Sequence, residues 1–462
     1  MLEIIDIVSI IISSFLFIIS TFLVFKQEKY LLWVPLFLIC TGQMLRLPIA
    51  VSQIGILTAD LLIPWIIFLW FIKKLIIQRT LPKTHLGLSI YLFIGALTLS
   101  LFLAIPTLPT SEFATSLFYL IRQAAYLLFF FPIFEAFTKY DKSKFIKHIF
   151  IASIILCILG ILQFIYVPDF TFMAKAEGWD PHIGRLLSTW YDPNFIAGFF
   201  AFIISLFSSL YIDSKEKLKH LGYPLGIILL TSCFILTYSR SGIVALAVSI
   251  LIIAILRARS LLIIGLIGLF LGITISDRFS ERFYGMIDSA IATITGSLDH
   301  DVDLTSQERI ASYEQVGIII SDHYLFGIGF NNIKYYKLSK GLVADPNKHS
   351  ASGSDSSLLN IFMTSGIFGL CFFFYFLYSA SRMSLILFLQ SKKYSMAKGF
   401  GLGMFASLIA LFFHSFFVNS LLYPLFLLIL MPLLGLLENL YQEMLDISNN
   451  SMNKQRQESI PE

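Results

Sequence analysis

The sequence predicts an all-α fold: a polytopic bundle of about 12–13 transmembrane helices with a long helical extracytoplasmic loop. Of its 462 residues, 57% are hydrophobic and 13% are charged, whereas about a quarter of the residues in a soluble domain are charged. The mean hydropathy is +0.81. Apolar runs of about 15 to 25 residues recur along the chain, long enough to cross a bilayer core about 30 Å thick. The lipid bilayer is therefore the expected environment, and the composition does not indicate a nucleic-acid partner.

About thirteen runs are candidate spans. They cover 4–25, 31–45, 56–72, 86–106, 113–137, 147–167, 193–212, 223–238, 242–256, 260–275, 356–380, 398–418 and 421–438. The run 31–45 is short for a full crossing, so a broken or re-entrant helix there would leave about twelve spans. The first run lacks a basic n-region and a cleavage site, so we expect a retained span rather than a signal peptide.

Lysine and arginine gather in five short loops, and such loops stay in the cytoplasm. These loops lie near 73–83, 139–147, 215–219, 257–259 and 382–398. An even number of expected spans separates each loop from the next, so one orientation satisfies all five. We therefore expect a protein of the cytoplasmic (inner) membrane, with the loops 168–192 and 276–355 outside and a disordered cytoplasmic tail over 441–462.

The loop 276–355 is the longest polar stretch. Its segment 306–321 has helical periodicity, with Ile310, Tyr313, Val316 and Ile320 on one face. We expect short amphipathic helices on the outer membrane surface.

Arginines outside the basic loops are the first candidates for chemistry. Arg122 lies in the middle of a predicted span, where an arginine is costly and indicates function by default; a structural pair with a carboxylate such as Asp60 is the alternative. Arg185, Arg240 and Arg309 lie on the expected outer side. A guanidinium offers a planar fork of donors suited to phosphate, so the four together favour binding of a pyrophosphate group.

Two acidic or amide side chains and two possible bases lie beside predicted span ends. Asp192 and Asn194 precede an apolar run, where either could support the arginines or cap the helix. His349 and Asp355 precede the run 356–380, and either could be a general base. Loop polarity and helix capping are the alternatives for this second pair.

Cofactor and metal signals are weak. The four cysteines lie inside apolar runs and are expected to pack as small hydrophobic residues. The segment DHDVD, 299–303, is the one metal candidate, and a solvated loop is the simpler interpretation. Gly327 and Gly329 form only a GxG, and the sequence contains no Walker A motif. We expect no cofactor and no metal.

Four segments in order resemble the O-antigen ligase and O-antigen polymerase superfamily of bacterial envelopes. They are RLLSTWYDPNFIAGFF (185–200), LTYSRSGIVAL (236–246), ERIASYEQVGIIISDHYLFGIGFNNI (308–333) and SSLLNIFMTSGIFGL (356–370). The resemblance covers about 185–375. It divides the chain into N-terminal helices 1–184, a ligase/polymerase-like core 185–375 that includes the loop 276–355, C-terminal helices 376–440 and the tail 441–462.

This resemblance implies metal-independent glycosyl transfer outside the cytoplasm. The implied donor is a glycan on a polyprenyl pyrophosphate, and the acceptor is a hydroxyl of a glycan or of lipid A–core. Arg122, Arg185, Arg240 and Arg309 would stabilise the departing pyrophosphate. His349 or Asp355 would deprotonate the acceptor.

One departure from the family pattern bears on the reaction. Ligase-like members often carry a histidine directly before the final segment, where this chain has Asp355. The aspartate favours a repeat-unit polymerase modestly over a ligase. A lipid-glycan flippase or other transporter is the alternative class, but it does not explain the long polar loop or the outward arginines. An inactive scaffold is a third possibility.

Overall fold

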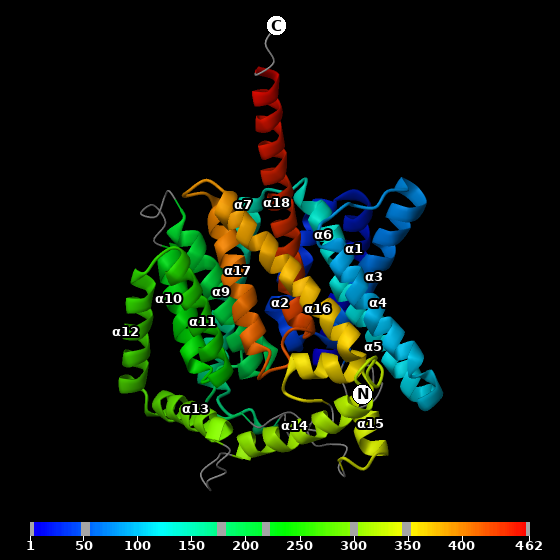
Figure 1. Ribbon diagram of the computed structural model, residues 1–462, viewed down its shortest axis with the longest axis vertical. Coiled ribbons are helices and arrows are strands. Elements are labelled where there is room, and N and C mark those ends of the chain that lie inside the picture. The colour runs from blue at the N-terminus through cyan, green and yellow to red at the C-terminus, as the bar shows by residue number, and fades with distance from the viewer. Residues whose placement is uncertain are drawn as a thin grey trace.

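Long apolar helices that run between two ends of the molecule form a bundle (Figure 1). The computed structural model describes residues 4–47, 56–172, 182–214, 222–295, 304–343 and 353–458. Within these ranges the only strands are the short antiparallel pair β1 (Arg46–Leu47) and β2 (Ile56–Leu57). The predicted all-α polytopic bundle is therefore confirmed.

The helices of the N-terminal part are α1 (Ile4–Lys26), η1 (Glu28–Leu32), α2 (Trp33–Thr41), η2 (Gly42–Met44), α3 (Thr58–Phe71), η3 (Ile72–Gln78), α4 (Gly87–Leu103), η4 (Ile105–Thr107), α5 (Thr110–Leu128), α6 (Phe130–Phe137) and α7 (Lys142–Tyr166). The remaining helices are η5 (Ser188–Trp190), α9 (Pro193–Ile212), α10 (Gly222–Leu236), α11 (Arg240–Leu256), α12 (Ser260–Ile275), α13 (Asp277–Thr295), α14 (Leu304–Asp322), α15 (Ile333–Ser339), α16 (Ser357–Gln390), α17 (Met396–His414) and α18 (Pro424–Glu458).

Each of the expected apolar runs contains helix, but not every helix is long enough to cross a bilayer alone. Seven described helices are long and apolar enough to cross a membrane, or eight if the bent pair of α12 and α13 counts as one span. The helices α4, α10 and α11 are apolar but shorter. The expected count of about 12–13 is therefore higher than the number of full-length helices, because several runs fold into helices of fewer than 18 residues.

The second apolar run crosses the bundle completely. At one end, Lys73 Nζ donates to the carbonyl of Val24, near the end of α1, and forms an ion pair with Glu28. At the other end, Ser9 Oγ donates to the carbonyl of Arg46. Ser9 and Val24 are about 22 Å apart along α1 at 1.5 Å per residue. The chain from Glu28 to Arg46 therefore returns across the bundle, through η1, α2 and η2.

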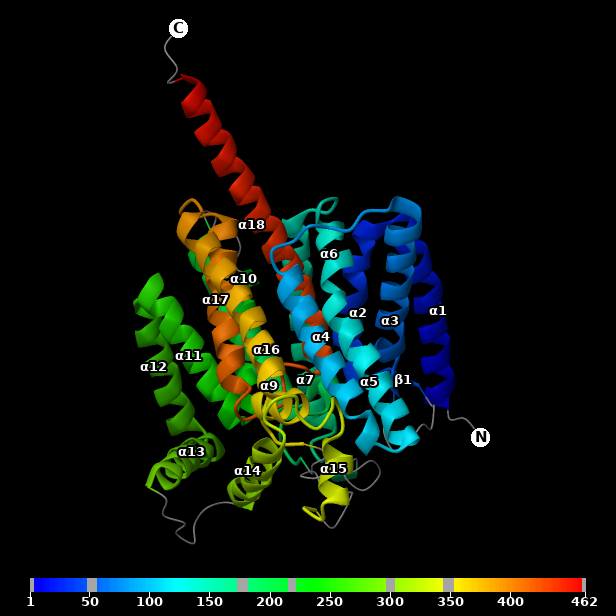
Figure 2. The same ribbon diagram turned by 45° about the vertical axis from the view of Figure 1, so that its right-hand side comes forward.

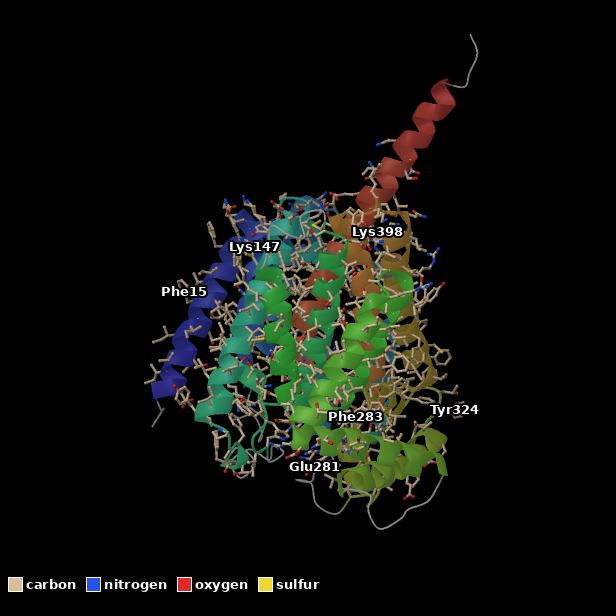
Figure 3. The ribbon with its side chains drawn as sticks, turned by 90° about the vertical axis from the view of Figure 1, so that its left-hand side faces the viewer. Phe15, Lys147, Glu281, Phe283, Tyr324 and Lys398 are labelled. Atoms are coloured by element: carbon tan, nitrogen blue, oxygen red, sulfur yellow. The ribbon has the colours of Figure 1, made fainter. Side chains whose placement is uncertain are left out.

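The two ends of the bundle differ in charge. Lys147 and Lys398 mark one end, which we call the basic end, and Glu281, Phe283 and Tyr324 mark the opposite end (Figure 3). The helices α13, α14 and α15 lie across that opposite end, which we call the loop end (Figures 1 and 2). The lysine- and arginine-rich short loops predict a cytoplasmic basic end and an outward loop end.

This orientation predicts which sites react with a membrane-impermeant thiol reagent. In a chain freed of its four cysteines, Ser339→Cys, exposed in α15, should react while the cytoplasmic membrane is intact. Lys392→Cys, exposed at the basic end, should react only after lysis and is the matched control. The reverse pattern would invert the topology and remove the proposed function from the outer face.

The centre of the bundle is held by close helix packing around α9, α17 and α18. Three glycines in α17 allow this approach. A Cβ at Gly403 would be 2.9 Å from the Leu206 side chain of α9, and one at Gly401 would be 2.7 Å from the backbone of Phe388 in α16. Small residues let helices approach where lipid offers no hydrophobic driving force for their association. Gly399 plays the same part against Leu210.

The C-terminal tail differs from the expectation of disorder after residue 441. Helix α18 continues to Glu458 and projects beyond the basic end (Figure 1). The apolar part of α18 starts the helix inside the bundle, and the polar residues that follow extend it turn by turn. Extending an existing helix costs far less than nucleating a new one.

The surface helices confirm the helical loop but correct the buried face of α14. Val316 and Ile319 are buried, against Ile328, Ile333 and Met363, whereas Tyr313 is exposed. The side chain of Ile310 lies outside the described residues. Among the described side chains of α14, the buried apolar stripe contains Ile319 in place of Tyr313, because Val316 and Ile319 pack against Ile328, Ile333 and Met363.

Candidate functional site

Arg185 joins the turn between α10 and α11 to the start of α9 at the loop end. Its Nε donates to the carbonyl of Thr237 at 2.8 Å, at the turn between α10 and α11. Its NH2 donates to Asn194 Oδ1 at 3.3 Å, in the first turn of α9. The adjacent Leu186 N–H donates to the Leu236 carbonyl at 2.9 Å. The segments 185–200 and 236–246, both predicted to contribute to the site, are therefore in direct contact.

Three more arginines act on Arg185 through their charge, and we call Arg185, Arg240, Arg278 and Arg282 the arginine cluster. Burial lowers the pKa of Arg185 to about 10; Asp192 opposes this shift, and the charges of the other three arginines add to it. The group still carries its proton at neutral pH. Three arginines and one carboxylate, Asp192, act on Arg185 through their charge, and such a gathering of cations favours an anionic ligand.

Arg278 belongs to the surface helix α13, and two backbone carbonyls hold its guanidinium in place. Its NH1 donates to the carbonyl of Gly184 at 2.6 Å and its NH2 donates to that of Ile183 at 2.7 Å. The guanidinium also lies over the ring of Tyr238, 4.7 Å from the centroid. Gly184 has a φ of +58°, and a Cβ there would be 2.7 Å from Arg278 NH1. A glycine is therefore needed for this contact.

The starts of two helices point into the same region. Asp192 caps α9, accepting from the N–H of Asn194 at 2.7 Å and of Phe195 at 3.0 Å. Ser239 caps α11 and donates to Asn194 Oδ1 at 2.9 Å. Capping, one of the two interpretations of Asp192, is thus observed, while Asn194 bridges Arg185 and Ser239. Helix N-termini carry partial positive charge and favour anions nearby.

Asp355 is connected to this region through α17. Ser356 Oγ, next to Asp355, donates to the carbonyl of Ser415 at 3.2 Å. The neighbouring His414 is fully buried, and a Cβ at Gly198 in α9 would be 2.8 Å from its ring. Gly198 lies one turn beyond Asn194. The end of α17 therefore contacts both the residue after Asp355 and the first turns of α9.

The turn that holds Asp355 is rigidly hydrogen-bonded. Ser354 N–H donates to Asn360 Oδ1 at 2.8 Å, and Asn360 Nδ2 donates back to the Ser354 carbonyl at 2.8 Å. Lys337, buried in α15, donates from Nζ to the Gly353 carbonyl at 3.1 Å. Burial lowers the pKa of Lys337 to about 8. Asp355 itself is half-buried.

Glycines at 327 and 366 allow the segment before α15 to contact α16. Gly366 interrupts α16 with φ +63° and ψ −165°, and a Cβ there would be 2.2 Å from the Leu325 carbonyl oxygen. A Cβ at Gly327, which has φ +73°, would be 2.4 Å from the backbone of Thr364. Gly327, the first glycine of the GxG, therefore serves close packing against α16.

Replacing Gly366 with alanine should destabilise the protein measurably. The substitution adds left-handed strain of about 1–3 kcal/mol and a backbone clash. We expect a lower thermal unfolding midpoint and less monodisperse protein on size exclusion. Gly317→Ala in α14 is the control, since a Cβ there meets nothing within 4 Å and alanine favours helix. Equal midpoints for the two variants would contradict the proposed role of the kink.

Arg122 forms the structural pair that was the alternative to substrate binding. Its NH1 is 3.4 Å from Asp60 Oδ2, and Tyr126 OH donates to Asp60 Oδ1 at 3.0 Å. Its guanidinium also lies 4.5 Å from the centroid of the Tyr119 ring. Its buried Nε has no hydrogen-bond partner among the described residues. A role for Arg122 in substrate binding therefore stays a prediction.

Two predicted residues cannot be placed in the site. His349 lies outside the described residues, and so does the side chain of Arg309, although Arg309 itself belongs to α14. The segment 299–303, the metal candidate, is also outside them. Among the described residues, no group of three or more histidine, cysteine, aspartate or glutamate side chains could hold a metal ion.

Arg278, Arg282 and Lys337 are site residues that the sequence patterns do not single out. One signal for the arginines is present in the sequence: they are four residues apart in an amphipathic segment, and therefore lie on one helix face. Lys337 gives no such signal, because its burial depends on the packing of α15 beneath the turn that leads to Asp355.

Comparison with known proteins adds one match. Residues 225–374 match a family model described as O-antigen ligase. The match includes Arg240 and the arginines of α13 and α14, together with Asp355, and it begins after Arg185 and Asn194. No curated protein matches the chain.

Proposed function

We propose, from the chain's membership of the O-antigen ligase superfamily, that it transfers a glycan from a polyprenyl-pyrophosphate carrier to an acceptor hydroxyl at the loop end of the bundle. The family implies a glycosyl-transferring enzyme, and the apolar helices make it a multi-pass membrane protein. The donor, the acceptor and the side of the cytoplasmic membrane are our proposal.

The observation that carries the proposal is the arginine cluster. It collects four guanidinium groups from three chain segments: the loop before η5, the start of α11, and α13. A pyrophosphate is a multiply charged anion that binds well to guanidinium forks and helix N-termini. The cluster lies at one end of the membrane-crossing helices, where the head group of a lipid carrier would be. Arg309 and Arg122 are further candidates for contact with the carrier.

The reaction needs charge stabilisation and one proton acceptor. The acceptor oxygen attacks the anomeric carbon, a carbon–oxygen bond forms, and the bond between that carbon and the pyrophosphate oxygen breaks. The acceptor proton moves to Asp355, with His349 as the alternative base. The pyrophosphate leaves on its polyprenyl chain, and the arginines stabilise its developing charge. The energy of that linkage drives transfer, so the proposal requires no divalent metal and no nucleotide.

Asp355 favours a repeat-unit polymerase over a ligase to lipid A–core or another acceptor. A carboxylate stands directly before the final family segment, where ligase-like members often have histidine. Deletion of the gene tests the assignment. We expect single repeat units on the carrier or at the cell surface and a loss of long chains. Long chains stranded on polyprenyl pyrophosphate would identify a ligase instead, and unchanged lipid-linked glycans would contradict glycosyl transfer altogether.

A further inference from the structure

A second charged site lies at the basic end, on the opposite side of the molecule from the arginine cluster. It is a cavity of about 470 Å³ between the end of α1, η1, η3 and the end of α6. The residues that line it are Phe25, Lys26, Gln27, Glu28, Lys29, Lys73, Gln78 and Lys139. Half of these side chains are lysines, and one is acidic.

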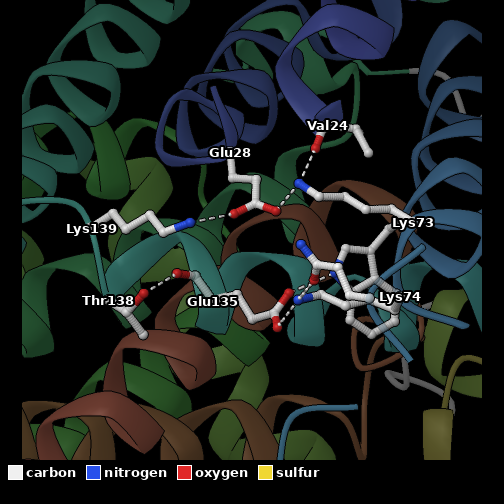
Figure 4. Close-up of polar contacts among 9 residues, drawn as sticks. Val24, Glu28, Lys73, Lys74, Glu135, Thr138 and Lys139 are labelled. Carbon is white, nitrogen blue, oxygen red and sulfur yellow. Dashed lines mark hydrogen bonds and ion pairs between the residues drawn. The ribbon is translucent and has the colours of Figure 1, made fainter. Parts of the chain in front are cut away.

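Ion pairs shape the wall of this cavity (Figure 4). Glu28 accepts from Lys73 on one side and from Lys139, at 2.9 Å, on the other. Lys73 is buried, and its Nζ also donates to the Val24 carbonyl at 2.7 Å. Burial alone would raise the pKa of Glu28, but the hydrogen bonds and charges of the two lysines lower it overall. Glu28 is therefore a carboxylate that holds two lysines in fixed positions.

The cavity keeps a positive charge after these pairs are counted. Lys26, Lys29, Lys73 and Lys139 contribute four positive charges and Glu28 one negative charge, so the lining carries 4 − 1 = +3. Lys26 has no ion-pair partner among the described residues, and Lys29 lies over the Tyr30 ring, 5.0 Å from its centroid. A concave site with such an excess of lysines favours an anion with several acceptor oxygens.

Nearby Lys74 does not add to this excess. Its Nζ lies 2.5 Å from Glu135 Oε1, and the other oxygen of Glu135 accepts from Trp70 Nε1 at 2.8 Å. Lys74 and Gln78 also share a hydrogen bond of 2.7 Å. This neighbouring pair is neutral, so Lys74 does not change the charge of the cavity.

An exposed apolar stripe on α1 leads to the cavity. It consists of Ile11, Phe15, Ile18, Phe22 and Phe25. Their spacing of four, three, four and three residues places them on one face of the helix, and Phe25 lines the cavity itself. Exposed Tyr30 and Trp33 lie at the same end, and such rings anchor at the membrane–water interface. An acyl chain could follow the stripe while its head group occupies the cavity.

We propose that this cavity binds the phosphate-bearing head group of an anionic membrane lipid, whose acyl chains lie along the apolar stripe of α1. Basic pockets between transmembrane helices on the cytoplasmic side are suited to such head groups. A free phosphate could bind to the lysines in the same way as a lipid phosphate. The apolar stripe, which reaches the rim of the cavity, favours a lipid as the ligand. The site is independent of the proposed glycosyl transfer.

Lipid retention by the purified full-length protein tests the proposal. Native mass spectrometry would compare cardiolipin or phosphatidylglycerol with phosphatidylcholine, added at equal concentration to delipidated protein. We expect at least about fivefold greater retention of the anionic lipids, a difference of about 1 kcal/mol. Lys26→Gln combined with Lys29→Gln should remove most of this preference. These two lysines are chosen because the Glu28 ion pairs remain intact without them.

The matched control is Lys392→Gln with Lys393→Gln, two lysines of the basic end that do not line the cavity. This control should retain the lipid preference. Equal retention of phosphatidylcholine, or full preference in the Lys26/Lys29 variant, would overturn the proposal. A third arm adds inorganic phosphate without lipid. Thermal unfolding is then measured with phosphate and with the anionic lipid. If phosphate stabilises the protein as much as the lipid does, and the Lys26/Lys29 variant loses this effect, the ligand is a free phosphate and not a lipid.

Discussion

Arg185→Ala is expected to lower glycan transfer by about two to three orders of magnitude, the typical loss when one preorganised donor to a developing negative charge is removed. Burial lowers the pKa of Arg185, and its hydrogen bonds orient it between α9 and the α10–α11 turn. Lysine at this position should rescue poorly, because an ammonium cannot bond to Thr237 and Asn194 and still present a fork to phosphate. The measurement is transfer by purified protein with a lipid-linked glycan, in excess chelator.

Controls separate lost chemistry from lost folding. Arg259→Ala removes an exposed arginine at the basic end and should leave transfer unchanged. Because Arg185 also joins two elements, its variants need a thermal unfolding measurement beside the activity assay. Arg240→Ala offers a second probe of the cluster. Normal transfer by folded Arg185→Ala and Arg240→Ala would show that the cluster does not bind the leaving pyrophosphate. Loss of wild-type transfer in chelator would contradict the metal-free reaction.

Asp355→Asn is expected to lower transfer by about two to four orders of magnitude, the usual contribution of a general base. The substitution keeps the shape of the side chain but removes its capacity to accept a proton. The turn around it should persist, because Ser354 and Asn360 fix it through their own mutual hydrogen bonds. Donor binding should remain, so the loss should appear in the rate and not in the affinity for the lipid-linked glycan.

Asp322→Asn is the matched control, since Asp322 is an exposed carboxylate at the end of α14 and should tolerate the change. His349→Ala distinguishes the two possible bases. If Asp355→Asn transfers normally and His349→Ala does not, the base is the histidine. The preference for a polymerase would then lose its chemical basis, while the match of residues 225–374 to the O-antigen ligase family model would be unaffected.

The sequence by itself determined the membrane bundle. The length of an apolar run decides whether it can cross the bilayer, and the placement of lysines predicts its orientation; both are local properties of the sequence. It also located Arg185, Asn194 and Arg240, since polar groups that directly precede an apolar run are conspicuous. The helical loop was visible in the periodicity of 306–321. The exact buried face was not, because Ile319 is buried and Tyr313 exposed through packing against Ile328, Ile333 and Met363, which the periodicity of α14 cannot reveal.

Only the tertiary structure decided which of these groups meet. Arg278 joins Arg185 because α12 and α13 meet at a bend of 113°, which turns the start of α13 toward the carbonyls of residues 183 and 184. Arg122 pairs with Asp60, 62 residues away along the chain. Lys26, Lys29, Lys73 and Lys139 look like ordinary basic loop residues until folding arranges them around one cavity. The physical reason is the same in each case: hydropathy depends on neighbours in sequence, whereas charge pairing and burial depend on neighbours in space.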